Sequence, residues 1–105
     1  MEYLSQREEQ ILLAIGYLQE DAYLVAIRKH LSSVIGRELS IGAVHIPLRR
    51  IEKQGLITAS FGESTAVRGG RRKKIYRLTA SGLAALDKNK KVSDRLRADY
   101  LNVRA

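Results

Sequence analysis

Cysteine and tryptophan are absent from this sequence of 105 residues, and proline occurs once. Without cysteine the chain can form neither a disulfide nor a thiolate metal site, and nothing indicates secretion. No apolar run approaches the roughly 20 residues that a membrane-spanning helix needs. The first residues, MEYLSQREEQ, are polar and acidic, unlike the basic and then apolar start of a signal peptide. We therefore expect a protein of the cytoplasm with no membrane partner.

Acidic residues are few beside the basic ones. The chain has 19 Lys and Arg against 11 Asp and Glu, a formal net charge of +8 at pH 7. Such a balance favours a polyanionic partner, which is nucleic acid or, less often, an anionic membrane surface. The hydrophobic share of 45% is that of an ordinary globular protein, so we expect one folded unit and not a disordered chain.

Residue patterns for catalysis are also missing. Neither His30 nor His45 has a second histidine at i+4, so a metal site is poorly supported. No serine stands in a nucleophile-elbow context, and GESTAVRGG (62–70) lacks the spacing and the lysine of a phosphate-binding loop. We therefore expect no enzyme activity, no cofactor and no metal.

Three amphipathic helices are predicted over residues 5–18, 22–36 and 40–55. Ser5 and Glu8 form a capping box at the start of the first. The expected caps of the other two are Asp21 and Ser40, and their expected ends are Gly36 and Gly55. The expected apolar positions are Ile11, Leu12, Ile15 and Leu18 in the first helix, with Leu13 on a second buried side, and Tyr23, Leu24, Ile27, Leu31 and Val34 in the second.

The apolar period then changes from helical to alternating. Residues 56–62 and 74–79 alternate as half-buried strands do, and the connection between them contains Gly-Gly and a run of basic residues. This pattern predicts a hairpin with a long basic tip. Residues 80–104 predict a long helix capped by Thr79, and a break or bend is possible at 88–91, where the apolar stripe thins.

The resulting element order is α-α-α-β-β-α, mainly α with a small β-hairpin. This is the order of a winged helix-turn-helix domain with an added C-terminal helix. We assign residues 1–79 to the winged helix-turn-helix domain and residues 80–105 to a C-terminal dimerisation helix, the two forming one compact unit.

The third helix has one apolar and one basic side. Ile41, Val44, Leu48 and Ile51 share the side expected to pack, whereas Gly42, Ile46, Arg49, Arg50 and Lys53 point away, with His45 at the flank. In one interpretation, residues 40–54 form a recognition helix whose cations meet phosphates or guanine edges in the major groove. In the other, the cations are only the solvated face of an amphipathic helix. A second basic cluster on the hairpin favours the first interpretation, in which the third helix binds DNA.

Smaller features of the third helix fit the first interpretation. Gly42 and Ala43 permit close backbone approach, and Ser40 with the first-turn amides could hold a phosphate. Ile46 is explained by contact with a thymine methyl group or by packing against a neighbouring helix. Pro47 removes one backbone hydrogen bond and should kink the helix, although proline is also tolerated near a helix start.

The basic residues of the hairpin are predicted to line the wing, residues 62–74. They are Arg71, Arg72, Lys73 and Lys74, which follow Gly70 at the tip and upper edge of the second strand. Because residues 75–78 anchor this strand, the cations are held in place, and we expect them to contact the phosphate backbone.

Three blocks together resemble the PadR family of bacterial transcriptional regulators: DAYLVAIRKHL, LSIGAVHIPLRRIEKQGLI and GGRRKKIYRLTASGLAAL, within residues 8–86. The resemblance implies a homodimeric winged-helix regulator, usually a repressor, whose dimer joins the C-terminal helix to the partner's first helix. It places groove contacts on Ser40, Gly42, Ala43, His45 and Arg49, and wing contacts on Gly70, Arg71, Arg72 and Lys73. Where the family usually has Tyr-Pro-Thr-Leu, this chain has His45, Ile46, Pro47 and Leu48, which bears on base preference.

Apolar residues of the C-terminal helix are candidates for the dimer interface. They are Leu83, Leu86, Leu96, Tyr100, Leu101 and Val103. Leu83 and Leu86 could instead pack on their own domain. A dimer would place two recognition helices about 34 Å apart and predict a palindromic operator. A further hypothesis is an effector pocket lined by Tyr3, Tyr17 and Tyr100 where the dimer helices cross.

The leading hypothesis is therefore a sequence-specific, DNA-binding transcriptional repressor that is found at the nucleoid when bound. Two others compete with it. The first is a non-specific architectural or RNA-binding winged helix, and the second is a protein-interaction module whose basic face meets an acidic partner. An enzyme ranks last.

Overall fold

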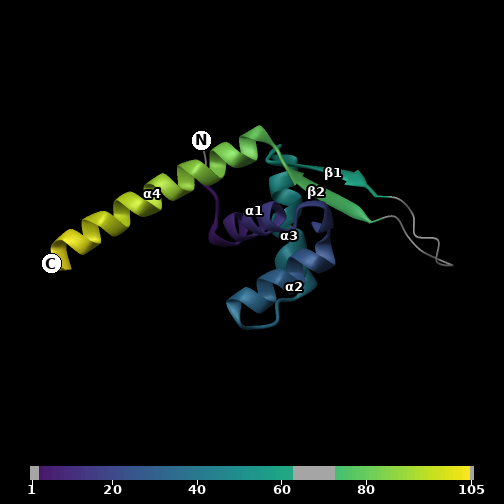
Figure 1. The fold of residues 1–105 in the computed structure, drawn as a ribbon, viewed down its shortest axis with the longest axis horizontal. Coiled ribbons are helices and arrows are strands. Elements are labelled where there is room, and N and C mark those ends of the chain that lie inside the picture. The colour runs from purple at the N-terminus through teal and green to yellow at the C-terminus, as the bar shows by residue number, and fades with distance from the viewer. Residues whose placement is uncertain (1–2, 63–72, 105) are drawn as a thin grey trace.

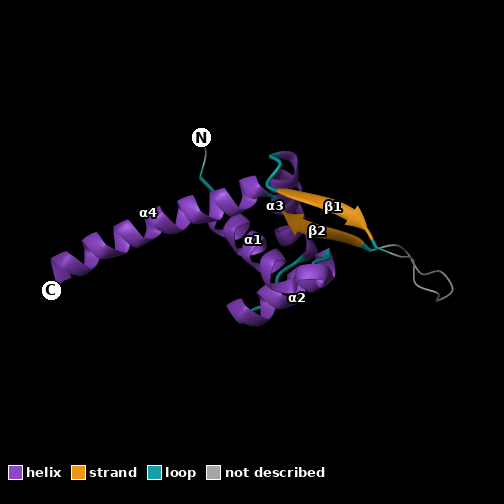
Figure 2. Ribbon diagram, turned by 45° about the horizontal axis from the view of Figure 1, so that its top comes forward, coloured by secondary structure: helices purple, strands orange, loops and turns teal. Residues whose placement is uncertain are grey.

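The computed structural model describes residues 3–62 and 73–104 (Figure 1). Its elements are α1 (Gln6–Leu18), a 3₁₀ turn (Gln19–Asp21), α2 (Leu24–Ile35), α3 (Ile41–Lys53), β1 (Ile57–Phe61), β2 (Lys74–Leu78) and α4 (Ala80–Arg104). This is the predicted winged helix-turn-helix order. The hairpin and α4 extend from the helical body in opposite directions, so that the molecule is elongated, 61 Å in its longest dimension (Figures 1 and 2). None of the helices in the described ranges is long and apolar enough to span a bilayer.

The start of α1 is closed by the predicted capping box. Ser5 Oγ accepts a hydrogen bond from the Glu8 amide (3.1 Å), and Glu8 Oε1 accepts one from the Ser5 amide (2.8 Å). Two of the amides that a helix start leaves unpaired are thereby satisfied. The carboxylate also suits the positive end of the helix dipole.

The second helix begins later than predicted. The 3₁₀ turn takes up Asp21, which was the expected cap, and α2 starts after Tyr23 in the cap position without a side-chain hydrogen bond. Ala22 between them is fully buried, and its carbonyl accepts a hydrogen bond from the Tyr76 amide (2.8 Å). This short segment therefore anchors β2 to the helical body. At its other end α2 stops at Gly36, which is left-handed (φ 86°) as a C-terminal glycine should be.

The core lies where α1, α2 and α3 meet the inner face of the hairpin. Its fully buried members come from every one of these elements: Ile11, Leu12, Ile15, Ile27, Val44, Leu48, Ile51 and Ile57. Three residues predicted to be buried are exposed instead, namely Leu13 (56%), Val34 (69%) and Ile41 (46%). Val34 and Ile41 stand in the last turn of α2 and the first turn of α3, beside the connecting turn and away from the core.

The recognition-helix candidate, α3, runs without a break through Pro47 to Lys53. Ser40 caps it, because its Oγ accepts a hydrogen bond from the Ala43 amide (3.1 Å). The chain turns away at Gly55, whose φ of 77° lies in the region that favours glycine.

The hairpin is antiparallel, with Ile57 opposite Leu78 and Phe61 opposite Lys74. Ile57 and Tyr76 are buried in the core, whereas Phe61 at the outer end of β1 is 64% exposed. The tip, residues 63–72, lies outside the described residues, and so do the predicted wing contacts Gly70, Arg71 and Arg72.

The last element, α4, is a single helix of 25 residues, and the break considered at 88–91 does not occur. Ion pairs one turn apart support it there: Lys91 Nζ lies 3.1 Å from Asp87 Oδ2, and Lys90 Nζ lies 2.6 Å from Asp94 Oδ2. Thr79 caps the helix as predicted, since its Oγ1 accepts a hydrogen bond from the Gly82 amide (3.1 Å).

Candidate nucleic-acid interface

The first turn of α3 presents a small, open surface. Gly42 is exposed, and a Cβ atom placed on it would meet no described atom within 4 Å beyond the adjacent residues and the nearby backbone of its own helix. Ala43 is half-buried, and Ser40 is exposed beside it. A backbone can approach a ligand closely at such a point, because no side chain holds it away.

The outer face of α3 is basic with one apolar member. Arg49 and Lys53 are exposed, and Ile46 is 61% exposed. Packing against a neighbouring helix of the same chain therefore does not account for Ile46. An exposed branched side chain between cations is a suitable group for contact with a thymine methyl.

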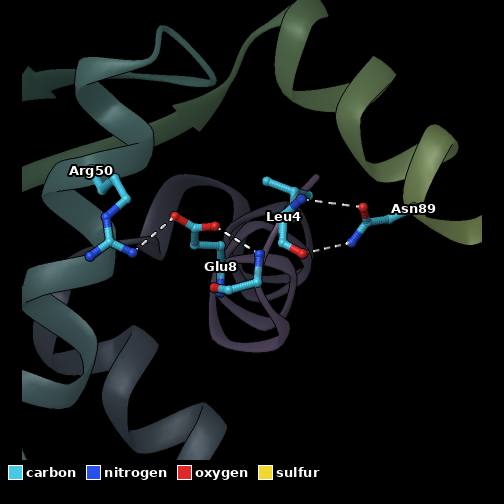
Figure 3. A network of polar contacts seen from close by, with 5 residues as sticks. Leu4, Glu8, Arg50 and Asn89 are labelled. Atoms are coloured by element: carbon cyan, nitrogen blue, oxygen red, sulfur yellow. Dashed lines mark hydrogen bonds and ion pairs between the residues drawn. The ribbon is translucent and has the colours of Figure 1, made fainter. Parts of the chain in front are cut away.

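Arg50 differs from the other cations of α3, because it is turned toward α1 (Figure 3). Its Nη1 lies 3.5 Å from Glu8 Oε2, and the Glu8 side chain is only 6% exposed. Among the described residues Glu8 is the one charged side chain in the buried class. A buried carboxylate needs a partner, so Arg50 joins α3 to the start of α1.

The structure brings one α3 residue together with the base of the wing. His45, Lys73 and Lys74 line the same hollow of about 300 Å³, together with Tyr23 and Tyr76. Lys73 Nζ lies 4.1 Å from the centre of the Tyr23 ring, a cation–π distance. The two sets of candidate DNA contacts, found separately on the third helix and on the hairpin, are thus adjacent.

Contacts with Glu52 and Tyr76 hold the Lys74 side chain in place beside this hollow. Lys74 Nζ lies 3.3 Å from Glu52 Oε1 and 5.4 Å from the centre of the Tyr76 ring. Burial raises the pKa of Tyr76, against a smaller opposing effect of Lys74, so the phenol stays neutral at physiological pH. The Nδ1 atom of His45 is buried without a hydrogen-bond partner in the described part of the chain.

The candidate interface residues of α4 fall into two groups. Leu96, Tyr100, Leu101 and Val103 are exposed by 63, 59, 57 and 86%, and Leu83 by 57%. Leu86 is half-buried and packs on the core of its own chain. Residues 90–104 of α4 are all exposed, so this half of the helix stands clear of the body.

Two apolar residues of α1 were not expected on the surface. Leu13 and Tyr17 are exposed by 56 and 71% and stand one turn apart. Leu13 and Leu86 line one groove between α1 and α4, and Tyr17 stacks on His30, with ring centroids 4.5 Å apart. The position of Leu13 off the apolar stripe of α1 was the signal in the sequence.

The three tyrosines considered for an effector pocket have separate neighbours in the protomer. Tyr3 lies under Lys88 (4.4 Å), Tyr17 lies on His30, and Tyr100 lies beside Arg104 (5.4 Å). In the described ranges, no three acidic, histidine or cysteine side chains are grouped so that they could hold a metal ion.

A three-helix unit with an adjoining basic hairpin and an open helix N-terminus defines a winged helix-turn-helix protein of the DNA-binding class. The chain belongs to the PadR-like family of transcriptional regulators, whose family model matches residues 11–88. Membership agrees with the resemblance seen in the sequence. No curated protein matches the chain significantly.

Solved structures agree with this assignment. A PadR-like transcription factor from Bacteroides fragilis is 25% identical with a TM-score of 0.74, over 93% of this chain and 88% of the other. A PadR-like transcriptional regulator from Bacillus cereus is 26% identical with a TM-score of 0.70, over 91 and 88% of the two chains. A PadR family transcriptional regulator from Eggerthella lenta is 25% identical with a TM-score of 0.71, over 92 and 82%.

Proposed function

We propose that this chain is a homodimeric transcriptional repressor that reads a palindromic operator, with α3 in the major groove and the wing on the flanking phosphate backbone. One observation carries the proposal. His45 of α3 and the wing residues Lys73 and Lys74 line a common hollow, so base-reading and phosphate-contacting groups would meet one stretch of duplex. Membership of a family of transcriptional regulators supports it.

The proposed contacts divide by chemistry. Arg49 and His45 are the candidates for base edges, with Ile46 for a thymine methyl group. Phosphates would be met by the first turn of α3 (Ser40, Gly42 and Ala43), by Lys53, and by the wing residues Gly70, Arg71, Arg72, Lys73 and Lys74. Arg50 is held by Glu8, so its contribution to DNA binding would require that ion pair to yield.

The proposed dimer rests on the apolar residues that the protomer leaves in water. Leu96, Tyr100, Leu101 and Val103 are all more than half exposed on the part of α4 that extends away from the body (Figure 1). A second copy that covers them would remove this surface from solvent. Leu13 and Tyr17 of the partner's α1, with Leu83, are the proposed counterpart.

Repression would follow from occupancy. A dimer bound to an operator that overlaps a promoter excludes the polymerase from the same DNA. Two recognition helices related by a two-fold axis would read half-sites about 34 Å apart, one turn of duplex.

Selection of bound fragments from the source genome tests the proposal. A sequence-specific regulator should prefer the selected palindrome over random duplex by about 10³ or more. Arg49→Ala should change base preference, whereas the double variant Arg71→Ala with Arg72→Ala should weaken binding to every sequence and flatten its salt dependence. Equal affinity for selected and random DNA would favour the architectural alternative, and a lack of nucleic-acid binding at low salt would favour a protein-interaction module.

A further inference from the structure

The start of α4 lies directly against the turn that follows α3. The Thr79 amide donates a hydrogen bond to the Leu56 carbonyl (3.1 Å), and Thr79 Oγ1 donates one to the Gly55 carbonyl (2.7 Å). One turn on, Gly82 is the buried residue of α4, and a Cβ atom on it would overlap the backbone carbonyl of Leu56. The start of α4 is thus pressed against the two residues that leave the recognition helix.

A second contact holds α4 to the body two turns further along. Asn89 Oδ1 accepts a hydrogen bond from the Leu4 amide (3.3 Å), and Asn89 Nδ2 donates to the Leu4 carbonyl (3.5 Å), as Figure 3 shows. The same Nδ2 lies 3.4 Å from Glu9 Oε2. Gly82, Leu86 and Asn89 lie on one face of α4, because they are spaced by four and three residues. We call this stripe the seat of α4.

The seat determines where the far end of α4 points. Beyond Asn89 the helix is exposed to its end, so in the protomer its direction depends on the seat. The helix between Gly82 and Tyr100 is about 27 Å long at 1.5 Å per residue. A tilt of about 10° at the seat would therefore displace Tyr100 by about 5 Å, more than the rise of about 3.4 Å for one base pair.

We propose that Gly82 and Asn89 are positioning residues that set the distance between the two recognition helices, and so the operator spacing that the dimer accepts. The inference rests on the proposed function, because it needs a dimer joined through α4. Gly55 and Leu56 lie in the short turn that follows the end of α3 at Lys53, so a change of seat angle is passed on to α3 through this turn. Gly82 fixes the angle by its missing side chain, and Asn89 fixes it by its hydrogen bonds.

Binding to duplexes of graded spacing tests this. Two copies of the half-site selected by the parent protein are separated by spacers that differ by one base pair at a time, and dissociation constants are measured by fluorescence anisotropy. Gly82→Ala should move the preferred spacing by one base pair or more and weaken binding at the parent's spacing by about tenfold or more, with the half-site sequence unchanged. Asn89→Ala adds no atoms and loosens the seat, so it should broaden the range of accepted spacings.

Gly16→Ala is the matched control. It makes the same chemical change within a helix, but the added Cβ would meet only the end of a side chain, Leu78 Cδ1 at 3.3 Å. It should keep the parent's spacing preference. Circular dichroism and light scattering establish that each variant is folded and dimeric before DNA is added.

The outcomes separate the two proposals. A parent protein that shows no dimer or no preferred spacing overturns the proposed function, and this inference with it. The parent protein could show a preferred spacing that a folded, dimeric Gly82→Ala variant keeps with the same affinity. That result overturns only the role of the seat. If Gly82→Ala does not fold, Asn89→Ala decides, and a spacing range equal to the parent's overturns the inference.

Discussion

The helical body and α4 are stabilised in different ways. In the body, α3 alone buries Val44, Leu48 and Ile51 completely, whereas the 25 residues of α4 have one member in the buried class, Gly82. The body is held by long-range apolar packing. The far half of α4 is held by its backbone hydrogen bonds and by side-chain contacts one turn apart on the same helix, such as the ion pair of Arg95 with Asp99 (3.3 Å). The difference agrees with the proposed dimer, in which a second copy covers the apolar residues of the far half of α4.

Truncation of a core residue of α3 should have the largest effect. Leu48→Ala should lower the free energy of unfolding by about 2–5 kcal/mol, because Leu48 is 0% exposed and a cavity would remain. Urea titration followed by circular dichroism at a fixed protein concentration measures it. A loss near zero would contradict the view that the body carries the stability.

Removal of the buried carboxylate should come next. Glu8→Ala deletes the acceptor for the Ser5 amide and the partner of Arg50, and it should cost about 1–3 kcal/mol. Glu20→Ala, in the exposed turn after α1, is the matched control and should leave the unfolding free energy unchanged. Equal effects of the two changes would show that the ion pair and cap add nothing to the body.

Alkaline pH should weaken the attachment of the hairpin by a smaller amount. Burial raises the pKa of Tyr76 in the folded state, so folding favours the neutral phenol. The contribution of the neutral Tyr76 side chain to the free energy of unfolding is complete below the ordinary tyrosine pKa of about 10. It is lost as pH rises through the folded-state pKa. Urea titrations at about pH 9 and about pH 11 measure this effect. Between these two pH values the free energy of unfolding should fall more for the parent than for Tyr76→Phe. Equal slopes would rule out this source of pH dependence.

Truncation in the far half of α4 should have the smallest effect on the protomer. Leu96→Ala should change its unfolding free energy by less than about 0.5 kcal/mol, because the side chain is 63% exposed. The same change should raise the dimer's dissociation constant by about tenfold or more, as measured by analytical ultracentrifugation. A large loss of protomer stability with an unchanged dimer would reverse the comparison between the two regions.

Local signals in the sequence predicted most of this fold. The caps at Ser5, Ser40 and Thr79 and the helix end at Gly36 follow from hydrogen-bonding and backbone preferences of single residues, and all four are observed. The predicted start of α2 was wrong, because Asp21 lies in a 3₁₀ turn and the Ala22 carbonyl accepts a hydrogen bond from Tyr76 of β2. The apolar pattern of a segment does not predict which other elements it contacts in the fold.

The sequence predicted which residues form the candidate site but not which side chains they contact. A helix wheel places Arg49 and Arg50 alike, and only the buried Glu8, far away in sequence, distinguishes them. The same limit applies to Leu13, whose exposure depends on where α4 crosses α1. Whether the contacts assigned to DNA are made stays a prediction.

The exposed far half of α4 also bears on how such a protein can diversify. From Arg95 to Arg104 every side chain faces solvent in the protomer, so substitutions there meet few constraints from the folding of the body. In the proposed dimer, the choice of partner could therefore change along this stretch while α3 and the wing stay unchanged. A duplicated gene could thereby acquire a separate pairing partner through a few surface substitutions, and the two copies would cease to mix before their DNA preferences diverged.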